Sequence, residues 1–496
     1  MKNRIVFLPV DERFCTRDYF LLLAKAAGLN VVTPDKRLLG MKKTAPDIQR
    51  LHEWIINNVR GDDILIASVD MIVHGGLIPS RMSLESDQTL NKRLEILDYL
   101  KSIGTKIYAG VCVTRAPFYN SAEEEPDYWQ YYGQDIYNIS RELVKFYENQ
   151  ASASELAQSI AKVPSWISED FFIRRNRNFR FVSRVIDYVK KGTIDFLNLT
   201  LDDNTQGSLS LWESEKHQKK AGDLGILSKV SIHAGADEST LTLLAKVLCD
   251  EFKVSPKFKV VYTEPEYKNF IPAYEGRPLE QGIKSHILSA GGLLCDDGED
   301  ITFYAHNPTN RKESNEQEYI ESDRYTATVD VLKKSESIVG IACIKYTNGS
   351  DNSMAKAVLN ARLNWNIFNF AGWNTAGNTV GTVCAYSIIQ YLGKKGLLKI
   401  DSYEMLKLQF VFFLEHWAFQ SNVRIDLIKK ANDEKGVPPW SVIPIERWAV
   451  DFTKSELKSY ADFIAQGIGF VYGDFDIFFP WHRSFELGVT VKTAKD

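Results

Sequence analysis

Short runs of β-branched and aromatic residues recur along the chain, and each ends abruptly in polar or acidic residues before a helix-like stretch. This alternation predicts repeated strand–helix units, and the continuous apolarity of the runs is typical of parallel strands buried on both faces. The runs predicted as strands are 4–10, 64–69, 106–113, 195–201, 229–233, 257–262, 301–304 and 338–346. Two further candidates are 29–33 and 367–372.

An alternation that extends from the N-terminus to about residue 380 places the chain in the α/β class. It is typical of a (β/α)8-type barrel with insertions, or alternatively of doubly wound parallel α/β sheets. We predict a barrel-like catalytic domain over residues 1–380, with a partly helical insertion at about 116–190. The alternation then stops, so residues 381–496 are expected to form a mainly helical region packed on that domain.

The composition narrows the class of protein. The chain has 496 residues, of which 44% are hydrophobic and 25% charged, with a formal net charge of -4. This balance excludes a disordered chain and lacks the basic surface that nucleic acid requires. There is no apolar run of about 18 residues, so no membrane partner is expected. The first ten residues are predicted to form a core strand and not an export signal. The six cysteines are widely scattered, which indicates reduced thiols. Both features predict a cytoplasmic protein.

Candidate chemistry gathers after the predicted strands, because parallel folds place functional residues at the carboxyl ends of strands. These ends are rich in carboxylates and carboxamides, which predicts a polar, negatively charged rim suited to a sugar or a metal ion. An indole beside amide donors is a reasonable subsite for a pyranose ring. The residues predicted to bind substrate are Asp11, Arg13, Asp70, His74, Arg81, Asp237, Glu238, Asn348, Asp351, Trp373 and Asn374.

The sharpest single feature is a buried strand that ends in two adjacent acids, Asp202 and Asp203. Neighbouring side chains at a strand end point in different directions and can therefore contact two atoms of one ligand. Two close carboxyl groups also push their pKa values apart, so that one can remain protonated and act as a general acid. This arrangement fits hydrolysis of a 2-acetamido sugar in which the substrate's own carbonyl oxygen is the nucleophile.

Residues 195–204 resemble the catalytic strand of the O-GlcNAcase family of glycoside hydrolases, whose barrel carries an Asp-Asp doublet after a similar apolar strand. The resemblance covers about ten residues. It implies that Asp202 orients the acetamido group and that Asp203 is the general acid and base.

A wider resemblance spans nearly the whole chain. The motifs that carry it are Leu8–Arg13, Asp70–Arg81, Gly235–Glu238, Asn348–Asn352 and Gly372–Asn378. They look like those of a mostly bacterial family of domains without an assigned function. The resemblance implies one integrated unit whose motifs lie at the strand ends.

The function predicted from these features is a retaining β-N-acetylhexosaminidase, acting on N-acetylgalactosamine or N-acetylglucosamine by substrate assistance, with no cofactor and no metal. Its partner is a small-molecule or oligosaccharide substrate. Two alternatives stay open. One is a metal-dependent sugar or sugar-acid isomerase or lyase, and the other is a non-catalytic carbohydrate-binding protein. The candidate metal ligands are Asp70, His74, His233, Asp237, Glu238 and His306.

Overall fold

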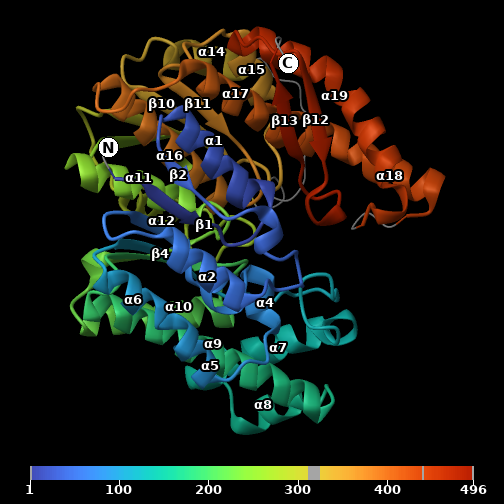
Figure 1. Cartoon of the computed structure of the whole chain (residues 1–496). Helices are drawn as coiled ribbons and strands as arrows, with labels where there is room; N and C mark the ends of the chain where they lie inside the picture. The colour runs from blue at the N-terminus through green and yellow to red at the C-terminus, as the bar shows by residue number, and fades with distance from the viewer. Residues whose placement is uncertain (1–2, 311–323, 438–440, 494–496) are drawn as a thin grey trace. The chain divides into compact units, whose positions relative to one another are not determined.

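The structure is a computed structural model that describes residues 3–310, 324–437 and 441–493 (Figure 1). Parallel strands alternate with helices, which confirms the α/β class. The chain forms two compact units, which we call the first unit and the second unit. The first unit comprises Met1–Glu12, Val31–Leu243 and Tyr274–Arg277, and the second comprises Arg13–Asn30, Leu244–Ala273 and Pro278–Asp496. Residues 381–496 therefore share a unit with the sheet that precedes them.

The first unit is built on a sheet of six parallel strands in the order β2-β1-β3-β4-β5-β6. Their bounds are β1 Ile5–Leu8, β2 Val31–Val32, β3 Ile64–Ser68, β4 Lys106–Val113, β5 Phe196–Leu201 and β6 Val230–Ala234. All residues of β1, β3 and β5 are buried, as their continuous apolarity predicts. An order in which the second strand lies outside the first is typical of doubly wound sheets.

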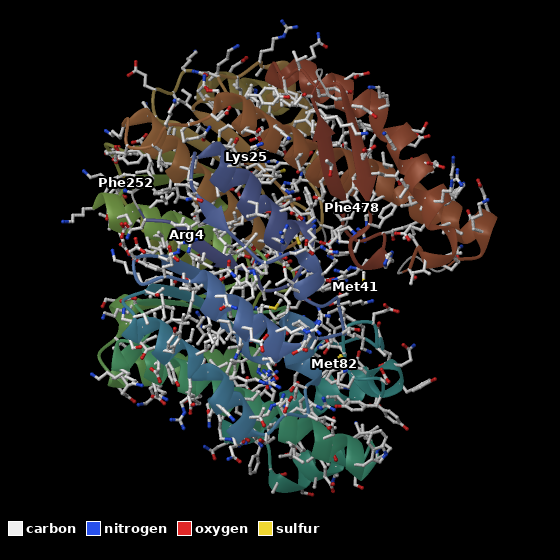
Figure 2. All side chains as sticks on the ribbon, in the orientation of Figure 1. Arg4, Lys25, Met41, Met82, Phe252 and Phe478 are labelled. Atoms are coloured by element: carbon white, nitrogen blue, oxygen red, sulfur yellow. The ribbon has the colours of Figure 1, made fainter. Side chains whose placement is uncertain are left out.

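A partly buried ion pair joins the starts of two neighbouring strands in this sheet. Arg4, which is labelled in Figure 2, lies just before β1 and donates to Asp63, just before β3, with 2.7 Å between Nη2 and Oδ2. The same guanidinium donates to the carbonyl of Asn58 at the end of α2. These contacts place Ile5 opposite Ile64, and hence bring the carboxyl ends of β1 and β3 to the same edge.

Helices complete the first unit, and each follows a strand or belongs to the predicted insertion. Their bounds are α2 Ile48–Asn58, α3 Val69–His74, α4 Leu77–Met82, α5 Asp87–Leu94, α6 Ile96–Ser102, α7 Trp129–Tyr147, α8 Ala153–Ile160, α9 Ser165–Lys191 and α10 Leu209–Asp223, with 3-10 turns Lys36–Leu38 and Leu227–Lys229. Helix α11, Ser239–Phe252, begins in the first unit and ends in the second. The insertion consists of α7, α8 and α9, with an apolar cluster of its own around Trp129, Ile136 and Ile167.

The second unit contains a sheet of five parallel strands in the order β11-β10-β9-β7-β8. Their bounds are β7 Lys257–Tyr262, β8 Leu293–Leu294, β9 Ile301–His306, β10 Ile338–Cys343 and β11 Phe368–Ala371. The helices that belong to this sheet and its edges are α1 Tyr19–Ala26, α12 Leu279–Ser289, α14 Arg324–Leu332, α15 Asn352–Asn360 and α16 Ala376–Lys394, with short turns Phe14–Asp18 and Pro265–Tyr267.

The C-terminal part of the second unit is mainly helical. It consists of α17 Ser402–Phe412, the π-helical segment Phe413–Val423, α18 Arg424–Lys435 and α19 Glu446–Ile468, with 3-10 turns Ile443–Ile445 and Pro480–His482. An antiparallel hairpin of β12, Asp474–Phe478, and β13, Gly488–Lys492, was not predicted. None of the described helices is both long and apolar enough to cross a membrane.

All ten runs identified from hydrophobic patterning are strands, and only the two-residue β8 was missed in the parallel sheets. Both residues of β8 are exposed, so it has no apolar signature. Among the described residues, the pairings give two parallel sheets, one of six strands and one of five.

Candidate active site

The Asp202–Asp203 doublet stands at the carboxyl end of β5, as predicted. The backbone N–H of Asp202 donates to the carbonyl of Val113, the last residue of β4, at 3.2 Å, and the chain then leaves the sheet. Oδ1 of Asp202 accepts the backbone N–H of Asp203 at 2.9 Å. This local bond orients the first carboxylate, while 29% of the second side chain remains exposed.

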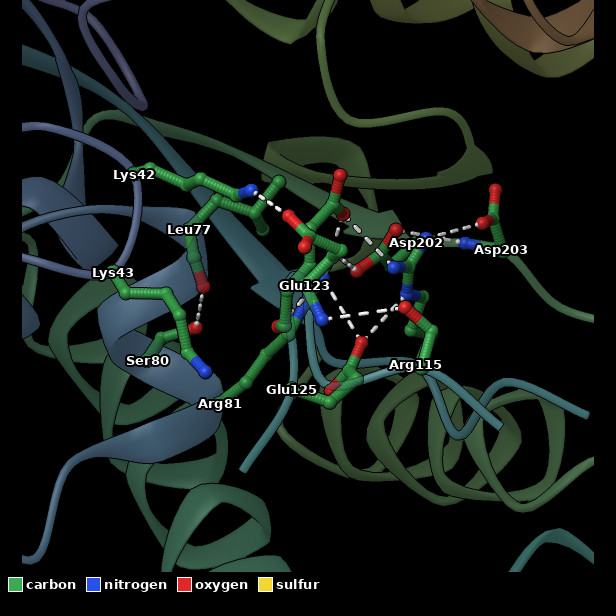
Figure 3. A network of polar contacts seen from close by, with 12 residues as sticks. Lys42, Lys43, Leu77, Ser80, Arg81, Arg115, Glu123, Glu125, Asp202 and Asp203 are labelled. Atoms are coloured by element: carbon green, nitrogen blue, oxygen red, sulfur yellow. Dashed lines mark hydrogen bonds and ion pairs between the residues drawn. The ribbon is translucent and has the colours of Figure 1, made fainter. Parts of the chain in front are cut away.

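Each acid of the doublet is paired with its own arginine. Nη2 of Arg81, from α4, donates to Oδ2 of Asp202 at 2.6 Å. Nη1 of Arg115, which follows β4, donates to Oδ2 of Asp203, also at 2.6 Å (Figure 3). The two guanidiniums are almost fully buried, so they act on the carboxylates with little solvent screening.

Two further acids bridge the arginines. Glu125 accepts from Arg81 at 3.0 Å and from Arg115 at 2.9 Å through the same oxygen, Oε1. Glu124 also contacts both, at 3.2 Å and 2.9 Å. Four carboxyl groups therefore share two guanidiniums, an excess of acid that favours retention of a proton within the network.

The environments of the doublet push the two pKa values in opposite directions. Burial by itself raises the pKa of Asp202, but the charges of Arg81 and Arg115 outweigh it and hold that pKa below its ordinary value. Burial also raises the pKa of Asp203, and the neighbouring Asp202 charge adds to this, so that Arg115 only partly offsets the rise. These surroundings favour ionisation of Asp202 and retention of a proton on Asp203.

Asp70 is a third buried acid near this doublet. It lies in the first turn of α3, directly after β3, and Oδ2 accepts the backbone N–H of Cys112 at 2.9 Å. Burial, together with the charge of Asp202, raises the pKa of Asp70 to about 7. Below pH 7 most Asp70 side chains are protonated and add little negative charge beside Asp202.

Asp203 opens onto a pocket whose walls are mostly aromatic and hydroxylated. The residues that line it are Ala116, Pro117, Phe118, Tyr119, Tyr137, Asp203, Asn204, Thr205, Ser208 and Tyr274. Phe118 contacts Tyr119 and Tyr137 edge-on, with ring centroids 5.7 Å and 6.1 Å apart. Burial raises the pKa of Tyr119 above its ordinary value, so its hydroxyl remains a hydrogen-bond donor. The pocket therefore combines one titratable acid with ring faces and hydroxyl groups.

Two lysines tie a neighbouring loop, residues 40–46, to the acidic segment 122–127. Lys42 pairs with Glu123, and its backbone N–H donates to Glu12 at 3.0 Å. Lys43 donates to Asp127 at 2.9 Å and to the carbonyl of Ala122. The segment that supplies Glu124 and Glu125 is thus held from both sides.

Several residues of the site were missed as individual candidates. They are Arg115, Glu124, Glu125, Tyr119, Tyr137 and Tyr274. For the residues within the insertion, the sequence signal was the acidic run 123–125 followed by aromatic residues. This pattern marked the insertion as distinct, but it did not indicate which part of the chain these side chains contact. Arg115 carried no signal, because nothing near it in sequence indicates that it meets β5.

The other predicted residues of the first unit are buried at neighbouring strand ends. Asp11 is buried and follows β1. Strands β3 and β4 lie between β1 and β5, so β1 is about 14 Å from the strand that carries the doublet. Asp237 and Glu238 follow β6, the direct neighbour of β5, and His233 Nδ1 lies 3.7 Å from Glu238. His74 packs edge-on against Phe181 of α9, with centroids 4.8 Å apart, in an apolar setting.

The remaining predicted residues belong to the second unit, where four of them stand at the carboxyl ends of β10 and β11. Asp351 caps α15, accepts from His306 at 3.0 Å and lies 3.3 Å from Lys345. Asn348 and Asn374 form a β-bridge, and both have positive φ.

Trp373 and Arg13 complete this group. The backbone N–H of Trp373 donates to Thr379 of α16 at 2.9 Å. Arg13 places its guanidinium 4.5 Å from the ring centroid of Trp481 and 3.9 Å from Glu486. The predicted residues of the second unit therefore contact other residues of that unit, and no contact between them and the doublet is described.

Parallel sheets with acids at their carboxyl ends define an α/β protein with a buried carboxylate–guanidinium network. Residues 5–490 match the model of a family described as a protein of unknown function, DUF4127, and the chain belongs to that family. No curated protein and no solved structure matches the chain.

Proposed function

We propose that this protein is a glycoside hydrolase, a retaining β-N-acetylhexosaminidase that works by substrate assistance. The observation that carries the proposal is the division of labour within the doublet: an ionised Asp202 held by Arg81, and an Asp203 of raised pKa that opens onto an aromatic pocket. Adjacent acids with separated pKa values are the arrangement that acid catalysis beside a fixed negative charge requires.

Asp203 acts first as the general acid. Its proton passes to the glycosidic oxygen as the bond to the anomeric carbon breaks, and the carbonyl oxygen of the 2-acetamido group forms the new bond to that carbon. Water then attacks the anomeric carbon from the vacated side and gives a proton to Asp203, which restores the acid and reopens the cyclic intermediate. Two inversions at one carbon retain its configuration.

Asp202 supports the nucleophile. Each carboxylate oxygen accepts one hydrogen bond within the protein, and an ionised carboxylate has about four lone-pair positions. A free position accepts the acetamido N–H and stabilises the positive charge that develops as the carbonyl oxygen attacks. The pairing with Arg81 keeps this carboxylate ionised while Asp203 holds its proton.

The pocket beside Asp203 encloses about 20 Å³, room for one water molecule, so we place the sugar ring against its aromatic rim and not inside it. Phe118, Tyr119 and Tyr137 offer ring faces, and Asn204 and Thr205 offer polar groups beside Asp203. Aromatic faces stack on pyranose rings, while a few polar groups form hydrogen bonds with the sugar hydroxyls.

The direct test is hydrolysis of a panel of aryl glycosides by the full chain, with and without EDTA. The panel contains β-linked N-acetylglucosamine and N-acetylgalactosamine together with their 2-hydroxy counterparts. We expect turnover of the 2-acetamido sugars alone, unchanged by the chelator, because the substrate supplies the nucleophile. Turnover of the 2-hydroxy sugars would contradict substrate assistance. No turnover of any member would refute the hydrolase, and loss of activity in EDTA would favour the metal-dependent alternative.

A further inference from the structure

The second unit has a pocket at the amino end of β11, whereas its predicted residues stand at the carboxyl ends of β10 and β11. The pocket encloses about 260 Å³, just below the roughly 300–1,000 Å³ of most small-molecule sites. Three segments surround it: residues 365–367 before β11, the last turn of α16, and residues 400–405 at the start of α17. Figure 1 labels β11, α16 and α17. The cavity is therefore large enough for a small molecule.

Buried hydrogen bonds join α16 to the two other segments. Gln390, in the last turn of α16, donates through Nε2 to the carbonyl of Trp365 at 2.9 Å. The hydroxyl of Tyr386, one turn earlier on the same face, donates to the carbonyl of Met405 in α17 at 2.8 Å. These bonds hold the helix against both walls of the pocket.

Two further contacts complete the frame. The last turn of α16 lies so close to the segment before α17 that a Cβ at Gly393 would overlap Cγ1 of Ile400, so a side chain there would force one of them to move. At the rim, the hydroxyl of Ser402 donates to Oδ1 of Asn366 at 3.3 Å. The three segments are thus joined in pairs, and the pocket is formed without a ligand, as most small-molecule sites are.

The pocket has an apolar interior. Its apolar lining residues are Trp365 and Met405, which are buried, and Ile367 and Ile400, which are half-buried. Nε1 of Trp365 is a buried donor for which the described residues supply no acceptor. An indole face beside a thioether and two branched side chains suits an apolar body of about the size of one or two rings.

The charge at the rim indicates what such a body carries. The described residues that line the pocket include one cation, Lys394, and no acid. The printed partner of Lys394 is neutral, because its Nζ donates to the main-chain carbonyl of Glu336, and the described residues place no carboxylate within ion-pair distance of it. The next residue, Lys395, lies outside the pocket, 3.8 Å from Asp300. An ammonium at the rim of an apolar cavity favours a ligand with a negative charge.

We propose that this pocket binds a small carboxylic acid with an apolar, ring-sized body. The body lies against Trp365 and Met405, and the carboxylate pairs with Lys394 at the rim, where the side chains of Asn366 and Ser402 offer further hydrogen bonds. One ammonium matches the single charge of a carboxylate better than the nearly double charge of a phosphate. The proposal is independent of the hydrolase function, because the pocket contains no residue of the Asp202–Asp203 network.

Titration calorimetry with the full chain tests the proposal. The probes are phenylacetate and indole-3-acetate, each compared with its neutral amide, so that the shape stays nearly constant while the charge is removed. At least one acid is expected to bind with a Kd of about 1 mM or tighter. Its amide should bind about three- to tenfold more weakly, because Lys394 is exposed and an exposed ion pair contributes little more than this.

Two adjacent lysines separate a direct contact from a general effect of charge. Lys394→Gln is expected to abolish the preference for the acid over its amide. Lys395→Gln is the matched control, because it removes the same charge from the neighbouring position outside the pocket, and the preference should persist. No binding of either acid, equal binding of acid and amide, or equal losses in the two variants would overturn the proposal.

A substitution at the rim locates the binding. Ser402→Trp adds an indole at the mouth of the pocket and is expected to abolish binding, whereas Ser402→Ala should keep it. Ser402 is exposed, and the cap of α17 is supplied by Asp401, so both variants are expected to unfold at the temperature of the wild type. Binding that persists in folded Ser402→Trp would place the acids outside this pocket and would overturn the proposal as well.

Discussion

Arg115 holds Asp203 through a 2.6 Å hydrogen bond between Nη1 and Oδ2, while Nε of the same guanidinium donates to Glu125 at 2.9 Å. One cation thus controls both the orientation of the proposed acid and the charge around it. Because Asp203 also lies next to the ionised Asp202, its proton affinity is set by two opposed neighbours. This relationship makes the site testable by substitutions that change one neighbour at a time.

Asp203→Asn removes the proton donor with little change in shape. We expect kcat on 2-acetamido glycosides to fall by about two to four orders of magnitude, since general acid catalysis contributes that much. The thermal midpoint should change little, because Asp203 is the more exposed member of the doublet. Asp187→Asn, at an ion pair with Lys220 outside the site, is the control and should keep its activity. An active Asp203→Asn enzyme would show that another group supplies the proton.

Asp202→Asn is expected to reduce both activity and stability. It removes a carboxylate that pairs with the buried Arg81, and breaking one partner of a buried pair costs about 3 kcal/mol or more. The remaining contacts of Arg81 with Glu124 and Glu125 moderate this loss. Denaturant unfolding measures the change, and a variant as stable as the wild type would indicate that these two glutamates alone satisfy Arg81.

Arg115→Gln should shift the pH profile of kcat/KM. Removal of the cation raises the pKa of Asp203 further, because burial and the Asp202 charge then act unopposed by Arg115. The acid must be protonated to work, so the alkaline limb is expected to move to higher pH. Arg115→Lys keeps the charge and should leave the limb closer to that of the wild type.

Arg180→Gln, at an exposed pair with Asp87, is the control for loss of one arginine, and its profile should match the wild type. An alkaline limb that stays in place or moves to lower pH in Arg115→Gln would mean that Asp203 is not the group seen in the profile.

Asp70 predicts a pH dependence of stability. Burial raises its pKa to about 7, whereas the unfolded value is about 4, so the folded state binds this proton more tightly. The stabilisation is complete below pH 4 and is lost as pH rises towards 7, which amounts to roughly 2 kcal/mol between pH 5 and 7. Asp70→Asn retains an acceptor for the Cys112 N–H and cannot ionise. We expect its unfolding free energy to vary less over this range than that of the wild type; equal slopes would contradict the assignment.

Gly75 and Gly192 form a matched pair for testing how tightly the 40–46 loop packs. Both end a helix with positive φ, +87° and +83°. A Cβ at Gly75 would lie 2.6 Å from Cδ of Pro46, whereas nothing lies within 4 Å of one at Gly192. Gly192→Ala should therefore cost about 1–2 kcal/mol from the backbone alone, and Gly75→Ala more. If denaturant unfolding gave the same loss of unfolding free energy for both variants, the 40–46 loop would have moved to accommodate the added methyl group.

The sequence predicted most of the fold because the relevant signals are local. Continuous apolar runs such as 64–69 and 195–201 identify strands buried on both faces, and all ten such runs are strands. The same reasoning placed Asp202, Asp203 and Asp70 at strand ends. It could not choose between one barrel and separate sheets, because the order of parallel strands depends on pairings between distant segments, which leave no periodicity in the chain.

The sequence by itself determined that acidic residues, including the doublet after β5, stand at the carboxyl ends of the strands. What only the tertiary structure decided is the direction in which the pKa of each acid is shifted. Arg81 and Arg115 are 121 and 88 residues from the acids that they pair with, and Tyr137 and Tyr274 reach one pocket from distant segments. The pKa of a buried acid depends on burial and on such neighbours, so the distinction between Asp202 and Asp203 exists only in the folded chain.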